Sequence, residues 1–400
     1  MTTPLKYKWP SVRLGDVAEF RNGVNYSKAN FGKGVKVIGV SDFQDNVKAS
    51  FDELEEINPA GVVRKEHYLK DGDILFVRSN GNRDLIGRNM FVENPPEEVT
   101  HSAFSIRVRF VCGDCLPRFY AYLLRSPLFR QSLSLHGGGT NISNLNQDIL
   151  GRLQVPLPPR PIQYQIALIL SAYDDLIENN TRRIKILEEM AQMIYREWFV
   201  NFRFPGYEKV KFVKSEMGSI PSTWPLRRIA DVVQFEYGKA LKSEDRKAGT
   251  IPVYGSSGVV GLHSQKLVAG PVIIVGRKGN VGSVFLSESD CWVIDTAYFV
   301  RPSISIYFLY FNFLTQNFLN NDAAVPGLNR NQAHSLPIVV PDQKLLDEFD
   351  SLILPMFQMK SCCIKRNELL RQTRGLLLPK LISGEVSVEH LEAESANQIS

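Results

Sequence analysis

The sequence contains few of the residues that build metal or redox sites. It has five cysteines and six histidines among 400 residues. Cys112 and Cys115 form a single CxxC pair, whereas a structural zinc site takes four ligands, which two such pairs usually supply. The other cysteines, Cys291, Cys362 and Cys363, do not repeat that spacing. We therefore interpret the CxxC pair as an ordinary turn in a protein of a reducing compartment, and we expect no metal site.

Long apolar runs are missing as well. No stretch approaches the roughly 18 consecutive apolar residues that a membrane helix needs, and the opening MTTPLKYKWP holds no apolar core of a signal peptide. We therefore expect a cytoplasmic protein that makes no contact with a membrane. A chain of 400 residues with 44% hydrophobic and 22% charged side chains is too long for one ordinary core and fits two or three globular domains.

The common catalytic signatures are absent. The sequence has no GxxxxGK[ST], HExxH or GxSxG pattern, and no GxGxxG that follows a strand and opens a helix. NPPE at 94–97 resembles the Asn-Pro-Pro-aromatic motif of DNA amino-methyltransferases, but Glu97 has no ring to stack on a flipped base. HGGGTN at 136–141 lacks a nucleophile elbow beside it and is more typical of a flexible loop. These absences disfavour a stand-alone methyltransferase or nuclease.

What the sequence does contain is a repeat. WPSVRLGDVAEF at 9–20 returns as WPLRRIADVVQF at 224–235, and GDILFVRSNGN at 72–82 matches GPVIIVGRKGN at 270–280. HSAFSI at 101–106 matches DTAYFV at 295–300, and LNQDILGRLQVPLP at 145–158 matches LNRNQAHSLPIVVP at 328–341. Because the matches keep their order, one unit is used twice. Short β-branched and aromatic runs between turn residues predict an α+β unit around a small twisted sheet.

A long helix is predicted after the first unit, from about Ile162. From Leu170 to Trp198 apolar residues recur at alternating spacings of three and four, which indicates a coiled-coil seam. Asn180 is the polar position of this seam, where a buried Asn typically fixes register and the number of partners; a place at a solvated edge is the alternative. The seam residues that we expect to set register or dock a partner are Tyr173, Ile177, Asn180, Ile184, Leu187 and Trp198.

A second helix follows the second unit. In the last of the four matches above, residue 145 is aligned with residue 328, and this alignment continues without a gap into both helices. We call it the repeat register. The seam of the second helix is poorer, because Lys360, Asn367 and Arg374 occupy seam positions, and Pro355 predicts a kink.

One chain can satisfy both apolar stripes by pairing the helices antiparallel, which would place the two units at opposite ends of a rod. The predicted segments are a first domain at 1–155, a helix at 156–204, a second domain at 205–340 with a linker at 205–223, a helix at 341–384 and a polar tail at 385–400.

The charge distribution follows the repeat. The net charge is +5, and residues 1–155 carry 20 basic against 17 acidic side chains, while residues 205–340 carry 14 against 10. The helical segments carry no basic excess, with 6 against 6 at 160–204 and 7 against 9 at 341–400. This pattern suits a polyanion bound by the repeated units and protein bound by the helices.

Four segments together resemble the specificity subunit of type I restriction–modification systems. They are WPSVRLGDVAEF, the stretch from VPLPPRPIQYQ to REWF at 155–199, MGSIPSTWPLRRIADVVQFEYGKA at 217–240 and LLLPKLISGE at 376–385. The resemblance covers nearly the whole chain. It implies two target-recognition domains, each of which reads half of a split double-stranded DNA site. It also implies two helices that separate these domains and dock methyltransferase subunits. We expect two methyltransferase subunits.

The same resemblance implies that this chain binds no cofactor and performs no catalysis. S-adenosylmethionine, ATP and Mg would be bound by the partner subunits, with restriction subunits as a further candidate partner. A coiled-coil scaffold that binds only protein is the alternative, but it leaves the two basic repeats unexplained.

Base reading requires long donors and acceptors on loops near the major groove. Arginine pairs naturally with guanine and asparagine with adenine, although a hairpin loop with solvated charges is the alternative for each residue. The repeated strand–loop offers Arg78, Asn80, Asn82, Arg83 and Arg88 in the first unit, and Arg277, Lys278 and Asn280 in the second. A weaker set consists of Asn141, Asn329 and Arg330.

Overall fold

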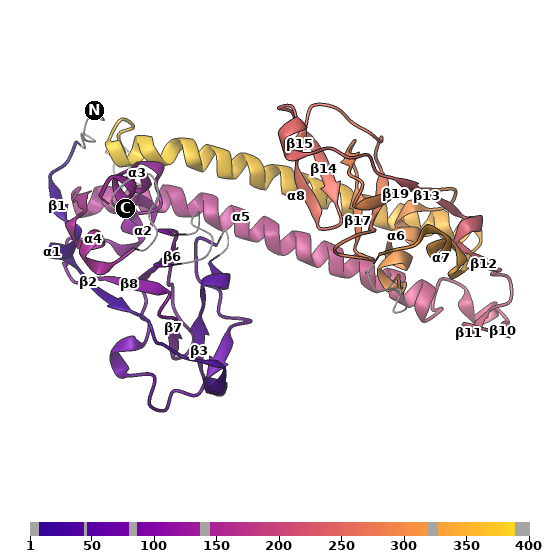
Figure 1. The fold of residues 1–400 in the computed structure, drawn as a ribbon, viewed down its shortest axis with the longest axis horizontal. Coiled ribbons are helices and arrows are strands. Elements are labelled where there is room, and N and C mark those ends of the chain that lie inside the picture. The colour runs from indigo at the N-terminus through magenta and orange to yellow at the C-terminus, as the bar shows by residue number, and fades with distance from the viewer. Residues whose placement is uncertain (1–7, 44–45, 80–85, 137–144, 319–326, 389–400) are drawn as a thin grey trace, which may run out of the picture. The chain divides into compact units, whose positions relative to one another are not determined.

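The chain forms two compact units, which are described separately below (Figure 1). The computed structural model describes residues 8–43, 46–79, 86–136, 145–318 and 327–388. Unit 1 comprises residues 1–180 and 365–400, and unit 2 comprises residues 181–364. Each unit therefore contains one α/β domain and one part of each long helix, α5 (Arg160–Tyr195) and α8 (Gln343–Ser383). The predicted domains are continuous segments of the chain, whereas unit 1 combines two separate segments. The predicted domain boundaries therefore remain a prediction.

In its described residues, unit 1 contains three small sheets and four short α-helices besides its parts of α5 and α8. The four-stranded antiparallel sheet has the order β2 (Ala18–Asn22), β8 (Ser105–Phe110), β5 (Ile74–Val77) and β6 (Asn89–Phe91). The three-stranded sheet has the order β4 (Glu55–Ile57), β3 (Phe31–Ile38) and β7 (Val99–His101), with β3 and β7 parallel. Strand β1 (Ser11–Arg13) pairs with β9 (Gln154–Pro156). The helices are α1 (Leu14–Val17), α2 (Pro117–Leu123), α3 (Pro127–His136) and α4 (Gln147–Arg152).

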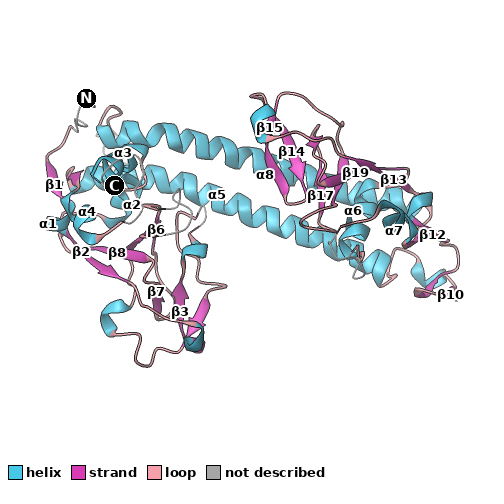
Figure 2. Ribbon diagram, viewed as in Figure 1, coloured by secondary structure: helices cyan, strands magenta, loops and turns pink. Residues whose placement is uncertain are grey.

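Unit 2 repeats this topology strand by strand (Figure 2). Its four-stranded sheet has the order β13 (Val233–Tyr237), β19 (Ala297–Pro302), β16 (Val272–Gly276) and β17 (Val284–Ser287). Its three-stranded sheet has the order β15 (Gly258–His263), β14 (Ile251–Gly255) and β18 (Trp292–Val293), and β12 (Leu226–Arg228) pairs with β20 (Pro337–Val339). Unit 2 also contains the hairpin β10 (Phe212–Ser215) and β11 (Gly218–Pro221), and the helices α6 (Ile306–Thr315) and α7 (Arg330–Ser335). The predicted duplication of an α+β unit is confirmed.

The central strands β5 and β16 are apolar throughout because both of their faces are covered. In β5, Ile74 and Phe76 enter the main core of unit 1, while Leu75 and Val77 enter a second core on the other face. Side chains alternate between the faces of a strand, so a strand with two buried faces needs a continuous apolar run. Strand β16 divides its side chains between two cores in the same way.

The long helices pair through the predicted seam. Between residues 175 and 190, only Ile177, Asn180, Ile184 and Leu187 of α5 are not exposed. Tyr173 and Trp198 are half-buried. As residue numbers rise along α5, their partners on α8 fall in number within both units, which is antiparallel pairing. The predicted antiparallel coiled coil is confirmed, and its residues' roles in register and docking remain predictions.

The polar seam positions have partners. In unit 1 the Asn180 side-chain amide donates to Asn367 Oδ1 at 2.9 Å, and both residues are buried. In unit 2 Lys360 pairs with Glu188 at 2.7 Å. Helix α8 is one uninterrupted element through Pro355, so the proline that predicted a kink does not break the helix. The structure describes no helix with an apolar stretch long enough to cross a membrane.

A buried polar node ties α2 to both long helices within unit 1. The Tyr122 hydroxyl donates to Asp174 Oδ2 at 2.6 Å, and the Arg374 guanidinium pairs with the other oxygen of the same carboxylate. Asp174 is 7% exposed. Because a buried carboxylate is tolerated only when its oxygens are bonded, α2, α5 and α8 are held in one arrangement.

Unit 2 fills the corresponding place with apolar side chains. In the repeat register, Asp174 corresponds to Phe357 and Arg374 to Ala191, and both of these counterparts are buried. Phe311 of α6 packs near Phe357, with ring centroids 6.1 Å apart. The same helix junction is therefore polar in unit 1 and apolar in unit 2.

We predict that Asp174→Ala lowers the free energy of unfolding by on the order of 3 kcal/mol, because it leaves Tyr122 and Arg374 without their partner in a poorly solvated place. The triple variant Tyr122→Phe/Asp174→Phe/Arg374→Ala copies the apolar junction of unit 2 and should recover most of that loss. Chemical unfolding of the two variants and the parent protein measures both effects. Equal destabilisation of the two variants would contradict the explanation.

Candidate nucleic-acid interface

In unit 2 the predicted loop begins where β16 ends. The backbone N–H groups of Arg277 and Lys278 both donate to the Thr296 carbonyl, at 2.9 and 3.0 Å. Gly279 follows with a φ of +78°, a conformation that glycine adopts without strain. The Asn280 amide then donates to Ser257 Oγ at 3.1 Å. The side chains of Lys278 and Asn280 are exposed, so this turn presents its donors to solvent.

The second predicted set of unit 2 lies against this loop. The Leu328 N–H donates to the Arg277 carbonyl at 2.9 Å, and Lys278 forms an isolated β-bridge with Gly327. Asn329 caps α7 by accepting the Asn331 N–H at 2.8 Å, and Arg330 is the first residue of that helix. The structure thus brings the two predicted sets of unit 2 together.

An exposed tyrosine joins the two sets. The guanidinium carbons of Arg277 and Arg330 lie 4.9 and 5.4 Å from the centre of the Tyr237 ring. Arg277 also lies 5.7 Å from the ring centre of Tyr298. Tyr237 is 50% exposed, whereas Tyr298 is buried. Cations within about 6 Å of a ring centre are attracted by the electron density of the ring face.

Unit 1 builds its loop with the same backbone hydrogen bonds. The Arg78 N–H donates to the Phe104 carbonyl at 2.8 Å, and the Arg78 carbonyl accepts the Leu145 N–H at 2.9 Å. Asn146 caps α4 by accepting the Ile149 N–H at 2.8 Å. Arg88 returns to β5 on the other side of the loop, where its carbonyl accepts the Val77 N–H at 2.9 Å. Four predicted residues lie outside the described part of the chain: Asn80, Asn82, Arg83 and Asn141.

These hydrogen bonds correct two of the sequence matches. The match of 72–82 to 270–280 set Arg78 against Gly276, but the bonds from Leu145 and Leu328 make Arg78 the counterpart of Arg277. The match of 101–106 to 295–300 was wrong by two residues, since Phe104 and Thr296 accept the equivalent bonds. Identical Gly and Ala residues determined those two matches. In the structure, the hydrogen bonds between strands determine which residues are equivalent.

Three further residues belong to this surface and were missed. Asn146 and Gln147 occupy the positions of Asn329 and Arg330 in the repeat register, so the repeat itself contained the signal. Tyr237 gave no signal, because an aromatic residue in a strand is typical of a core.

Burial shapes the electrostatics behind the loop of unit 1. Burial lowers the pKa of His101 to about 3, so its ring is neutral near pH 7. Its Nδ1 lies 2.8 Å from Ser105 Oγ, which donates to the Ser102 carbonyl at 2.9 Å. This network holds the turn whose Phe104 carbonyl receives the Arg78 N–H.

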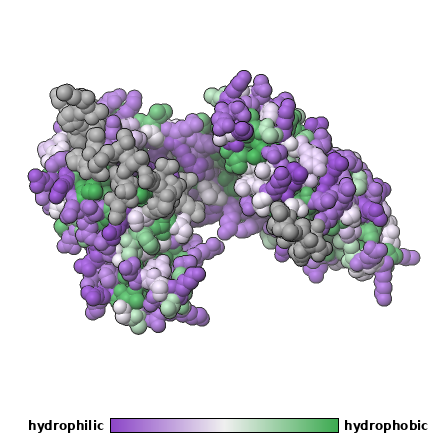
Figure 3. All heavy atoms as spheres, viewed as in Figure 1, coloured by the Kyte–Doolittle hydropathy of each residue, from purple (hydrophilic) through white to green (hydrophobic). Residues whose placement is uncertain are grey.

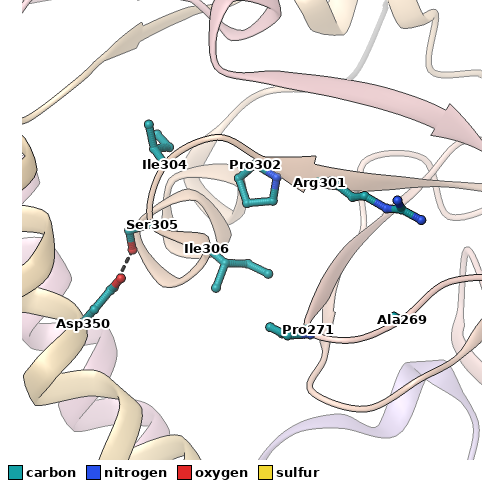
Figure 4. Close-up of a pocket in the computed structure, with 8 residues that line it drawn as sticks. All are labelled: Ala269, Pro271, Arg301, Pro302, Ile304, Ser305, Ile306 and Asp350. Atoms are coloured by element: carbon teal, nitrogen blue, oxygen red, sulfur yellow. Dashed lines mark hydrogen bonds between the residues drawn. The ribbon is translucent and has the colours of Figure 1, made fainter.

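A cavity of about 600 Å³ in unit 2 lies apart from these loops, at the start of α6 (Figure 4). The Ser305 hydroxyl donates to Asp350, whose pKa is raised by burial. Arg301 points away from that carboxylate in Figure 4. None of the predicted DNA-binding residues lines the cavity. Among the described residues, no group of three His, Cys, Asp or Glu side chains could hold a metal ion.

Three comparisons identify similar proteins. The family model for the type I restriction modification DNA specificity domain matches residues 6–189 and 221–354. The MjaIX specificity subunit of Methanocaldococcus jannaschii, from a type I restriction enzyme, is 26% identical over 301 residues, which are 68% of this chain and 69% of that protein. The HindI specificity subunit of Haemophilus influenzae is 21% identical, with 94% of this chain and 99% of that protein covered. A crystal structure of the S subunit from M. genitalium has a TM-score of 0.55 at 18% identity, and covers 95% of this chain and 98% of that one. The last likeness concerns the fold alone.

Proposed function

The chain belongs to the type I restriction modification DNA specificity family, and we propose that its two domains each read one half of a bipartite double-stranded DNA site. One observation carries this proposal. In both units a leucine N–H bonds the carbonyl of the arginine after the central strand, which sets that arginine beside an asparagine-capped helix. Because both units build the same kind of surface, the chain suits a DNA site that has two half-sites.

The residue types at this surface match the chemistry of base edges. Arginine presents a planar fork of donors, and asparagine offers a donor and an acceptor side by side. The two surfaces keep the arginine and the asparagine but differ at the next position, where Gln147 stands in unit 1 and Arg330 in unit 2. The two half-sites should therefore be unlike. Backbone N–H groups and other exposed lysines would add phosphate contacts, which are independent of sequence.

Within this proposal the chain performs no chemistry of its own. Methyl transfer and DNA cleavage would take place on partner subunits that bind S-adenosylmethionine, ATP and Mg. The sequence lacks the phosphate-binding and zinc motifs that such chemistry commonly uses. The chain would supply recognition and the frame on which the partners assemble.

Two equivalent apolar stripes suit a partner that binds twice. In unit 2, α5 exposes Ile186, Met190 and Met193, and a cavity of about 220 Å³ adjoins Met193. In unit 1, α8 exposes Leu369 and Leu376, which are 62% and 70% exposed and are the counterparts of Ile186 and Met193 in the repeat register. Contiguous exposed apolar surface marks protein interaction sites, and we assign these stripes to two methyltransferase subunits.

Most of the face shown in Figure 3 is hydrophilic, with a hydrophobic area beside β15. Val259 and Leu262 of that strand are exposed. They lie on the recognition domain of unit 2 rather than on a long helix, so they form no part of the two stripes.

The proposed reading is tested with the loop variant Arg277→Ala/Lys278→Ala/Asn280→Ala in a complex with methyltransferase subunits. We expect the methylated sequence to relax in one half-site only, with a loss of about 1–3 kcal/mol for each base contact removed. Mapping of methylated bases and mobility-shift titration provide the two measurements. The matched control Lys211→Ala/Lys214→Ala removes two exposed charges of the same unit and should keep both half-sites. Equal weakening on all DNA would make the loop a phosphate contact and refute base reading there.

The proposed docking is tested with a charge in each stripe. Met193→Glu and Leu376→Glu should each reduce the number of bound methyltransferase subunits from two to one, because a buried unpaired carboxylate opposes association. Native mass spectrometry of the assembled complex counts the subunits. Leu314→Glu, at an exposed apolar residue of α6, is the control and should leave two. Retention of both subunits in both stripe variants would reject these surfaces as the docking sites.

A further inference from the structure

The two equivalent arginines differ in what surrounds their side chains. The structure sets both Arg78 and Arg277 by the same two backbone hydrogen bonds. Strand pairing places Tyr237 and Tyr298 opposite each other in unit 2, and Asn22 and Ile106 at the same positions in unit 1. Unit 1 therefore offers no aromatic ring at either of the positions that contact Arg277.

The Arg277 side chain is restrained on several sides. Its guanidinium lies over the rings of Tyr237 and Tyr298, and its Nη1 donates to the Asp295 carbonyl at 3.3 Å. The Tyr298 hydroxyl donates to the Leu328 carbonyl at 3.0 Å, which fixes the buried ring beneath the arginine. A free arginine side chain loses rotamer entropy when it is ordered. Because the stack already orders the Arg277 side chain, much of this rotamer entropy is lost before a ligand binds.

Both guanidiniums of the stack keep donors available. Among the residues that the structure describes, no carboxylate forms an ion pair with Arg277 or Arg330. Arg330 lies over the outer ring, Tyr237, at the first position of α7. A guanidinium has five N–H donors in a rigid planar fork, and the Asp295 carbonyl takes one donor of Arg277. Arg277 is half-buried and Arg330 is exposed, so both forks retain donors at the loop that we propose to read bases.

We propose that Tyr237 is a positioning residue for Arg277 and Arg330, and that the half-site read by unit 2 contains a guanine recognised by Arg277. The inference rests on the proposed function and deepens it. Guanine presents N7 and O6 as two acceptors in the major groove, and a planar fork with fixed orientation matches that pair. Arg330, which contacts the same ring, fits a neighbouring guanine or phosphate. At the equivalent place of unit 1, Gln147 cannot supply a second guanidinium.

The test uses the full chain assembled with methyltransferase subunits. The DNA probe contains the sequence that this complex methylates. The half-site of unit 2 is the one that relaxes when the loop Arg277, Lys278 and Asn280 is replaced. Each guanine in that half-site is exchanged for 7-deazaguanine, which keeps base pairing and removes the N7 acceptor. Affinities for the cognate, substituted and unrelated duplexes are then compared among Tyr237→Ala, Tyr237→Phe, Arg277→Lys and the parent chain.

We expect one 7-deazaguanine to weaken binding of the parent chain and to have no further effect on Arg277→Lys. Arg277→Lys should lose about 5- to 150-fold of its discrimination for that base, since a bidentate pair contributes about 1–3 kcal/mol, while binding to unrelated DNA stays the same. Tyr237→Ala should lose about 2- to 5-fold for each guanidinium that it holds. Tyr237→Phe keeps the ring and should resemble the parent. Asn22→Ala, at the equivalent position of unit 1, should leave this half-site unchanged.

Several results would overturn the inference. They are a unit 2 half-site without guanine, an Arg277→Lys variant that still discriminates, or a Tyr237→Ala variant with unchanged specificity. If Tyr237→Ala did not fold, Tyr237→Leu, which removes the ring but keeps a larger apolar side chain, would replace it and should lose the same specificity. Failure of the proposed function looks different, because the parent complex would then show no preference for any bipartite sequence.

Discussion

The seam between α5 and α8 is the interaction on which both units depend. The main core of unit 1 includes Leu378, Leu381 and Ile382 from the end of α8, although its sheets are formed by residues before 157. The main core of unit 2 likewise includes Ala191 and Tyr195 of α5. The first domain therefore completes its core with a helix segment from the far end of the chain, and the second domain uses the end of α5 that precedes it. The two recognition domains cannot be separated by cutting the chain at its midpoint without exposing both cores.

We propose that the polar residues of the seam make its pairing specific. Asn180 and Asn367 bond each other in the part of the seam that belongs to unit 1, where Asp174 and Arg374 also pair. Their counterparts in the repeat register are all less polar, namely Cys363, Ile184, Phe357 and Ala191. An apolar pairing tolerates shifts, whereas a buried amide or carboxylate shifted by one turn loses its partner. In this proposal unit 1 supplies the specificity of pairing, and unit 2 supplies more of the apolar contact.

Much of this architecture could be predicted from the sequence, because it rests on periodicity. The repeat indicated the two α+β units, and alternating spacings of three and four indicated the seam with Asn180 on it. The pairing of Lys360 with Glu188 and of Arg374 with Asp174 could not be predicted, because it depends on which residues face each other across the seam. From the sequence, Lys360 and Arg374 were expected to make the apolar seam poorer. In the structure each of them has a partner on the facing helix. The candidate site was less predictable, since chain order could not show that the loops of Arg277 and Arg330 meet on the Tyr237 ring.

We propose that the paired helices, rather than the recognition domains, set the length of the unread spacer in the DNA site. The most direct measurement inserts one heptad into α5 after Ile184 and one into α8 at the facing Cys363, which preserves the seam, and then maps methylated bases. Seven helical residues add about 10.5 Å, so the unread spacer should lengthen by up to about 3 base pairs while both half-sites stay the same. A spacer of unchanged length, or a change within either half-site, would contradict the claim.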